Sequence, residues 1–169
     1  METIAVYWEE QIKVYGISDK FDLMLSTLTF DPSELEFWGQ QIAALEAGIK
    51  RFEFIACHRG EEVISLHLLL DKGSAKTLDE AVNRLAATRS LHCRKTWPVD
   101  LIYLHGPHFQ DRFGIADAAA TSLARHNLTP LITGCAGTSM YLVFRGGEGD
   151  RAKKTLTRTF LTPMDRQRS

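Results

Sequence analysis

The sequence has no long hydrophobic run, no excess of charge of one sign and no clustered cysteines. No apolar run approaches the roughly 20 residues that a membrane-spanning helix needs. The 20 basic residues nearly balance the 21 acidic ones, so a broad electrostatic surface for nucleic acid or an anionic membrane is not expected. The chain begins Met-Glu-Thr-Ile, without the basic and apolar segments of a signal peptide. We therefore expect a soluble, cytoplasmic protein.

The cysteines do not suggest a disulfide framework or a metal site. Cys57, Cys93 and Cys135 are odd in number, far apart in the sequence, and form no C-x-x-C pair. The sequence therefore predicts three free thiols.

The first half of the chain predicts the element order β-α-β-β-α. Its elements are strands over Gln11–Ile17 and Phe21–Phe30, a helix over 32–47, a two-stranded hairpin over 51–70, and a helix beginning at Thr77. Asp31 followed by Pro32 is typical of a helix start. Arg59–Gly60 indicates the hairpin turn, and Thr77–Glu80 has the form of a capping box.

The second half repeats this pattern. Its elements are a strand over Val99–Gly106, a helix over Gly114–Asn127, strands over Leu131–Cys135 and Met140–Phe144, and a last helix capped by Asp150. A shift of 78 residues places Leu23 on Leu101 and Leu45 on Leu123. An internal duplication accounts for the repeated pattern.

These patterns predict an α+β protein with two ferredoxin-like (βαββαβ) domains. Leu91–Trp97 supplies the final strand of the first repeat, whereas the second repeat ends in a polar tail. We expect the N-terminal strand, Ile4–Tyr7, to cross over and complete the second sheet. The predicted domains are residues 16–97, then residues 1–15 together with 98–162, followed by the tail 163–169.

Several short segments resemble the tandem ACT domains that form the regulatory part of aspartokinases. They are Gly106, Phe113–Ala116, Ala124–Leu128, Ile4–Tyr7 and Lys13–Lys20. Phe113 stands where that family usually has proline. The resemblance implies a homodimer, a small amino-acid ligand, allosteric regulation of a biosynthetic enzyme such as an aspartokinase catalytic chain, and an N-terminal strand that completes the second domain.

Catalysis is not expected from this sequence. It has no glycine-rich phosphate loop with a lysine and no room for a kinase domain. The resemblance therefore implies only the regulatory half of an aspartokinase, and we expect no cofactor.

The segment His105–Gly114 is the principal candidate site. A strand that ends in Gly106 and turns into a helix start presents free N–H groups, which suit an α-carboxylate, while Gln110 or Asp111 can accept from an α-ammonium. The predicted ligand-binding residues are Gly106, His108, Gln110, Asp111, Phe113, Gly114 and Ile115, with Asn127, Ile132 and Thr133 forming the opposite wall. Gly114→Val is expected to abolish binding and leave the fold intact.

The corresponding loop of the first repeat has two possible positions. If Gln11–Ile17 is the first strand of that domain, Asp19 and Lys20 lie in the ligand loop. If Phe21–Phe30 is the first strand, the loop contains Thr29, Asp31 and Ser33.

Other functions remain as alternatives. A small ferredoxin-like enzyme could use His108 and Asp111 as an acid–base pair, and a purely structural dimerisation module is also possible. His105, His108 and His126 lack the spacing of a helical metal site. A nucleic-acid-binding role ranks last, because the strands carry no basic-aromatic motif.

Overall fold

The computed structural model describes residues 12–45, 48–49, 51–86, 91–106, 109 and 113–162. The elements are β1 (Gly16–Phe30), the 3-10 helix η1 (Pro32–Glu34), α1 (Leu35–Ala44), β2 (Phe52–Arg59), β3 (Ile64–Asp71), α2 (Lys72–Ala86), β4 (His92–His105), α3 (Ile115–Arg125), β5 (Ile132–Ala136), β6 (Ser139–Arg145) and α4 (Gly149–Thr159). Hydrogen bonding orders the strands β2-β3-β1-β4-β6-β5. None of the helices in these described ranges is long and apolar enough to cross a membrane.

The chain divides into two compact units. Unit 1 combines the N-terminal segment through Asp19 with Ile102–Phe144 and the segment from Glu148 onwards. Unit 2 consists of Lys20–Leu101 and Arg145–Gly147. The division falls within β1 and within β4, so each of these strands contributes to both units.

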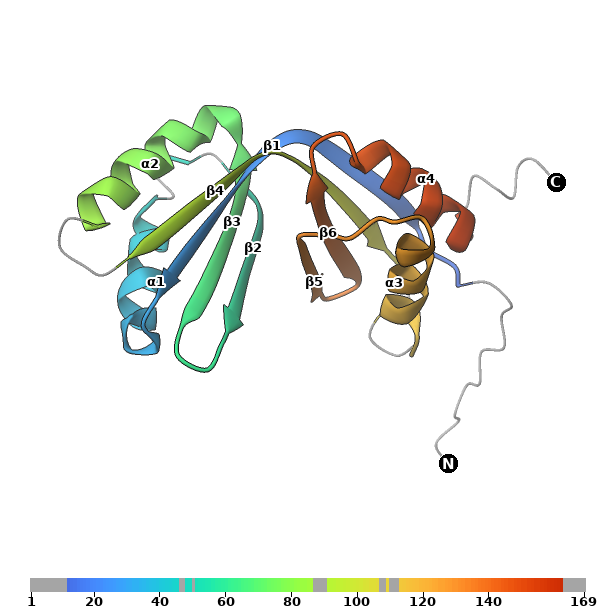
Figure 1. Ribbon diagram of the computed structural model, residues 1–169, viewed down its shortest axis with the longest axis horizontal. Helices are drawn as coiled ribbons and strands as arrows, with labels where there is room; N and C mark the ends of the chain where they lie inside the picture. The colour runs from blue at the N-terminus through green and yellow to red at the C-terminus, as the bar shows by residue number, and fades with distance from the viewer. Residues whose placement is uncertain are drawn as a thin grey trace. The chain divides into compact units, whose positions relative to one another are not determined.

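The core of unit 2 lies between one face of its sheet and the helices α1 and α2, which Figure 1 shows on the same side of the strands. Because side chains alternate across a strand, every second residue of β1 and β3 faces these helices. The buried members of this core are Met24, Leu28, Phe30, Trp38, Ile49, Ile64, Leu66, Leu68, Leu70, Leu78 and Val82.

The core of unit 1 includes a segment from near the N-terminus. Val14, 3% exposed, packs with buried residues of β4, α3, β6 and α4. Its N–H donates to the Leu161 carbonyl at 3.0 Å, and the Leu161 N–H donates to the Ile12 carbonyl at 3.0 Å. The predicted strand Ile4–Tyr7 lies outside the described residues. In the described part of the chain, residues 12–15 make these contacts with the second half.

Two predicted strand boundaries are wrong. The sequence predicts separate strands over Gln11–Ile17 and Phe21–Phe30, whereas β1 runs without a break from Gly16 to Phe30. It also predicts that Leu91–Trp97 and Val99–Gly106 are separate, whereas β4 continues through the cis peptide bond between Trp97 and Pro98. Pairing with neighbouring strands outweighs the local signals of proline and polar residues.

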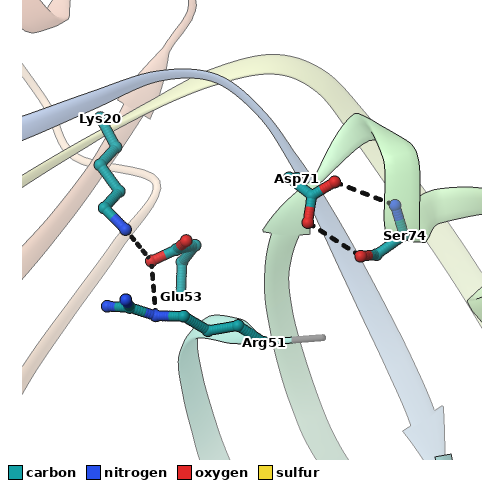
Figure 2. A network of polar contacts seen from close by, with 5 residues as sticks. All are labelled: Lys20, Arg51, Glu53, Asp71 and Ser74. Carbon is teal, nitrogen blue, oxygen red and sulfur yellow. Dashed lines mark hydrogen bonds and ion pairs between the residues drawn. The ribbon is translucent and has the colours of Figure 1, made fainter. Parts of the chain in front are cut away.

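Two predicted helix starts are also wrong. Helix α2 begins at Lys72, because the Asp71 carboxylate accepts from the Ser74 N–H at 3.0 Å and from its hydroxyl at 2.8 Å (Figure 2). Thr77 therefore lies inside this helix. Helix α4 begins at Gly149, with Glu148 rather than Asp150 at the capping position.

Candidate functional site

The end of β4 requires glycine at position 106. A Cβ atom there would lie 2.6 Å from Cε1 of Phe109 and 3.3 Å from the Lys13 carbonyl oxygen. The Gly106 N–H donates to the Thr138 carbonyl at 3.0 Å, which ties the strand end to the β5–β6 turn. Close approach of backbone and an aromatic ring therefore fixes where the predicted ligand loop begins.

The start of α3 has no side-chain cap from its own N-cap residue. Gly114 occupies that position with φ of 88°, a left-handed conformation that favours glycine. The first intrahelical bond runs from the Ala118 N–H to the Gly114 carbonyl at 2.8 Å. The preceding N–H groups have no acceptor within an α-helix, so this helix start can receive an anionic group.

The two residues beside Gly114 differ sharply in exposure. Ile115 is buried in the unit 1 core at 6% exposure, whereas Phe113 is 99% exposed. Ile115 anchors the helix start, and Phe113 presents an aromatic ring to solvent. A large apolar side chain in this position offers contact area to a ligand.

Part of the predicted site is not described. His108, Gln110 and Asp111 lie outside the described residues, as do Pro107 and Arg112. The acid–base pair of the alternative enzyme hypothesis, His108 with Asp111, lies there as well.

The residues predicted to form the opposite wall lie away from the start of α3. Asn127 lies just beyond the other end of α3, with φ of 53° and its N–H donating to the Ala124 carbonyl. This 11-residue helix is about 16 Å long at 1.5 Å per residue. Ile132 pairs with Val143, away from the hairpin turn that meets Gly106, and Thr133 follows it. The sequence indicated that these residues follow α3, but not which ends of the elements meet.

The sequence did not point to three residues that lie near the end of β4. Thr138 supplies the carbonyl bound to Gly106, and the Lys13 carbonyl faces it. Tyr15 donates its N–H to the His105 carbonyl at 2.7 Å, and the two rings lie 5.9 Å apart. Long-range pairing brings all three here. The predicted crossover of the N-terminal segment was a signal for Lys13 and Tyr15, whereas Thr138 lies in the β5–β6 turn.

The corresponding junction in unit 2 begins with the 3-10 helix η1, which Asp31 caps, whereas α1 has Glu34 at its N-cap and no side-chain cap. The Asp31 carboxylate accepts from the Ser33 N–H at 2.8 Å and from the Ser33 hydroxyl at 2.6 Å. These bonds hold the pKa of Asp31 below its usual value. Thr29 lies in β1, opposite Ser65. Asp31 and Ser33, two of the three candidate residues of this loop, thus bind each other.

The alternative placement of the first-repeat loop is wrong. Asp19 and Lys20 lie within β1 rather than in a loop. Asp19 pairs with Lys153 of α4. Figure 2 shows Lys20 meeting the Glu53 carboxylate, which is also 3.4 Å from Nε of Arg51. Both side chains therefore serve ion pairs within their units.

Metal-ligating side chains do not converge in the described ranges, where no group of three or more His, Cys, Asp or Glu residues has the arrangement of a metal site. Cys57, Cys93 and Cys135 are free, and burial raises the pKa of the Cys93 thiol.

A hollow of about 380 Å³ lies along α4, lined by Asp150, Lys153, Lys154, Thr157 and Arg158. None of these residues was a predicted ligand contact.

The sequence matches no protein-family model, and a search of curated proteins gives no match. Comparison with solved structures does find relatives of the same fold. The regulatory subunit of aspartate kinase from Thermus thermophilus, in a ligand-free form, has a TM-score of 0.76 at 14% identity, over 87% of this chain and 98% of that one.

Two further structures agree with this result. The regulatory subunit of aspartate kinase from Thermus flavus has a TM-score of 0.77 at 13% identity, over 87% of this chain and 98% of that one. Aspartate kinase from Synechocystis has a TM-score of 0.78 at 16% identity, over 90% of this chain and 27% of that one. The predicted resemblance is confirmed at the level of fold: this chain is similar in structure to aspartate kinase regulatory subunits and regulatory domains.

Proposed function

We propose that this chain is a non-catalytic regulatory protein of the ACT type. It binds a small amino acid at the start of α3 and modulates a partner enzyme, such as an aspartokinase catalytic chain. The observation that carries the proposal is the glycine-bounded junction between β4 and α3, with its left-handed Gly114 and fully exposed Phe113. The fold it shares with aspartate kinase regulatory subunits supports the regulatory role.

The ligand chemistry follows from the helix start. The α-carboxylate accepts from N–H groups of Ile115 and its neighbours in the first turn of α3, where the helix dipole is also favourable. We propose Gln110 or Asp111 as the acceptor for the α-ammonium, and His108 as a further ligand-binding residue. The amino-acid side chain contacts Phe113. Gly106 keeps the strand end close to Phe109 and so sets the loop geometry.

In this proposal unit 2 corresponds to the first ferredoxin-like ACT domain, predicted as residues 16–97. Unit 1 corresponds to the second, predicted as residues 1–15 with 98–162. Because the Asp31 carboxylate already occupies the N–H groups at the start of η1 in unit 2, we infer one amino-acid site per chain, in unit 1.

The outer strands favour a homodimer. Strands β2 and β5 stand at the two ends of the strand order, and an edge strand offers unpaired backbone groups to a second chain. Ile55 of β2 is 45% exposed, which adds apolar surface at that edge. Side-by-side pairing of these edges in a cytoplasmic homodimer completes the proposal.

Regulation requires that the ligand prefer one state of the protein. A ligand shifts an equilibrium only by its differential affinity for the two states. Allosteric coupling of this kind typically amounts to about 1–3 kcal/mol. An amino acid that binds the start of α3 more tightly in one dimer or complex than in another meets this requirement.

A thermal-shift screen against the twenty amino acids tests the proposal. A ligand at about 100 times its Kd adds roughly 2.7 kcal/mol of stability, so one amino acid is expected to raise Tm clearly. Absence of any hit at millimolar concentration would contradict the amino-acid site.

The Phe113→Ala variant then locates the site. Since Phe113 is 99% exposed, its removal is expected to change stability by less than about 0.5 kcal/mol while weakening the hit about tenfold. Phe21→Ala is the matched control, because Phe21 lies in unit 2 and is 45% exposed. Equal affinity in Phe113→Ala and the parent would place binding elsewhere.

A further inference from the structure

One face of the unit 2 sheet does not pack against α1 or α2. The core beneath these helices takes Leu66 and Leu68 from β3, so His67, between them, points to the opposite face. In register, His67 lies opposite Thr27 of β1 and Ala56 of β2. His67 and Thr27 therefore stand side by side on the face away from the helices.

His67 is held in place by a hydrogen bond and an aromatic neighbour. Its Nδ1 lies 3.0 Å from the Thr27 hydroxyl oxygen, which leaves Nε2 as the second polar atom of the ring. The ring centroid of His58, from β2, lies 5.1 Å away at an interplanar angle of 59°. His67 is only 9% exposed and Thr27 7%, whereas His58 is exposed.

Two basic residues lie on this face with His67. Burial, His58 and Arg94 each lower the pKa of His67, in that order of importance. Arg94 is an exposed residue of β4 that follows Cys93. Because Cys93 packs against the core beneath the helices, alternation along the strand places Arg94 on the same face as His67. This face thus carries neutral Thr27 from β1, the His58 ring from β2 and the guanidinium of Arg94 from β4.

Two imidazoles beside a guanidinium repel cations and suit an oxyanion. We propose that Thr27, His58, His67 and Arg94 form a binding site for a small oxyanion, a phosphate or a carboxylate, on this face of unit 2. Arg94 donates paired N–H groups to the anion, and the exposed His58 ring lets it enter from solvent. Bound negative charge favours the protonated imidazoles, so anion uptake is accompanied by proton uptake.

This site is separate from the proposed amino-acid site. Its four residues belong to unit 2, whereas Gly106, Phe113 and Gly114 belong to unit 1. The two proposals can therefore fail independently: loss of one binding activity leaves the other measurable in the same protein.

Titration with inorganic phosphate tests the inference. The histidine ring resonances are followed by NMR in the full chain, near pH 6 and near pH 8, with sodium chloride holding the ionic strength constant. We expect saturable shifts of His58 and His67, with binding about tenfold tighter near pH 6, where imidazoles gain their proton. Acetate is titrated in parallel to distinguish the two kinds of anion. Saturable shifts with acetate as well indicate a carboxylate site, and saturable shifts with phosphate alone indicate a phosphate site.

Arg94→Gln identifies the residues involved. We expect it to weaken phosphate binding about tenfold, with His58→Gln also weakening it. Arg125→Gln, at an exposed arginine of α3 in unit 1, is the matched control and is expected to bind as the parent does. Shifts that never saturate, or equal binding by Arg94→Gln and the parent, would overturn the proposal.

Discussion

The two strand-to-helix junctions differ in how their helix starts are satisfied. In unit 2, β1 passes within two residues into η1, and Asp31 binds the Ser33 N–H with its own carboxylate at 2.8 Å. In unit 1, β4 leads through a longer loop to Gly114, which has no side chain to offer α3. The chain thus supplies a carboxylate at the start of η1, whereas α3 receives no side-chain cap from its N-cap residue, which is the start that we propose a ligand occupies.

Under the proposed function, this difference gives the two repeats different tasks. A helix start capped by its own sequence contributes stability at all times, whereas an uncapped start gains that stability only when an external carboxylate arrives. The repeat that gives up the cap can therefore couple ligand binding to folding and assembly. We expect substitutions of Gly106 and Gly114 in unit 1 to affect binding and stability together, and substitutions at Asp31 to affect stability alone.

The largest effect is expected from Gly106→Val. The new side chain would meet the Phe109 ring and the Lys13 carbonyl, and the overpacking costs about 1–3 kcal/mol. Chemical denaturation is expected to show this loss, and calorimetry a loss of amino-acid binding. Gly39→Ala, in an open part of α1, is the control and is expected to stabilise by about 1 kcal/mol. Normal binding by Gly106→Val would contradict the loop's role.

Gly114→Val is expected to come second. No atom lies within 4 Å of its added Cβ, but φ of 88° strains a branched residue by about 1–2 kcal/mol. We therefore expect both Tm and binding to fall, while the fold stays largely intact. Gly114→Asn tolerates the left-handed conformation better and is expected to retain more stability. Equal stability of the two variants would show that backbone strain is not the cause.

Asp31→Ala is expected to have a smaller effect, confined to stability. It removes the acceptor for the Ser33 N–H and hydroxyl, so Tm falls, while Asp31→Asn preserves an acceptor and most of the stability. Amino-acid affinity is expected to match that of the parent in both variants. A reduced affinity in Asp31→Ala would mean that the unit 2 junction also takes part in binding.

The smallest effect is a pH dependence specific to unit 2. Burial, His58 and Arg94 lower the pKa of folded His67 below its ordinary value of 6.5, so the unfolded chain takes up protons first as the pH falls. Stability is therefore unaffected well above pH 6.5 and is lost as the pH falls through and below it. Denaturation of His67→Gln is expected to show a weaker pH dependence than the parent. His126→Gln, at an exposed histidine of unit 1, serves as the control.

Alternation and helical spacing predicted most of the elements. The hairpin β2–β3 follows from its alternating apolar residues, and Ile115, Ala119 and Leu123 form the buried face of α3 as expected. The capping-box pattern at Thr77 failed because Asp71 caps α2 one and a half turns earlier. Helix α1 presents Trp38 to the core, whereas its first residue, Leu35, is 49% exposed.

Only the residues of the candidate site with a signal in their own sequence neighbourhood could be predicted. Gly106 and Gly114 carry signals in their own neighbourhood, a strand end and a helix start. Asn127 and Ile132 were misplaced because the sequence does not say which ends of α3 and of the β5–β6 hairpin meet β4. The contact between Gly106 and Thr138 depends on strand order, which is a property of the whole sheet.

The stoichiometry of amino-acid binding tests the central claim most directly. Isothermal titration of the chain with the amino acid found by screening is expected to give one site per chain. The heat of binding is expected to disappear in Gly106→Val and to remain unchanged in Asp31→Ala. Two sites per chain, or binding lost with Asp31 and retained without Gly106, would contradict the assignment of the ligand to unit 1.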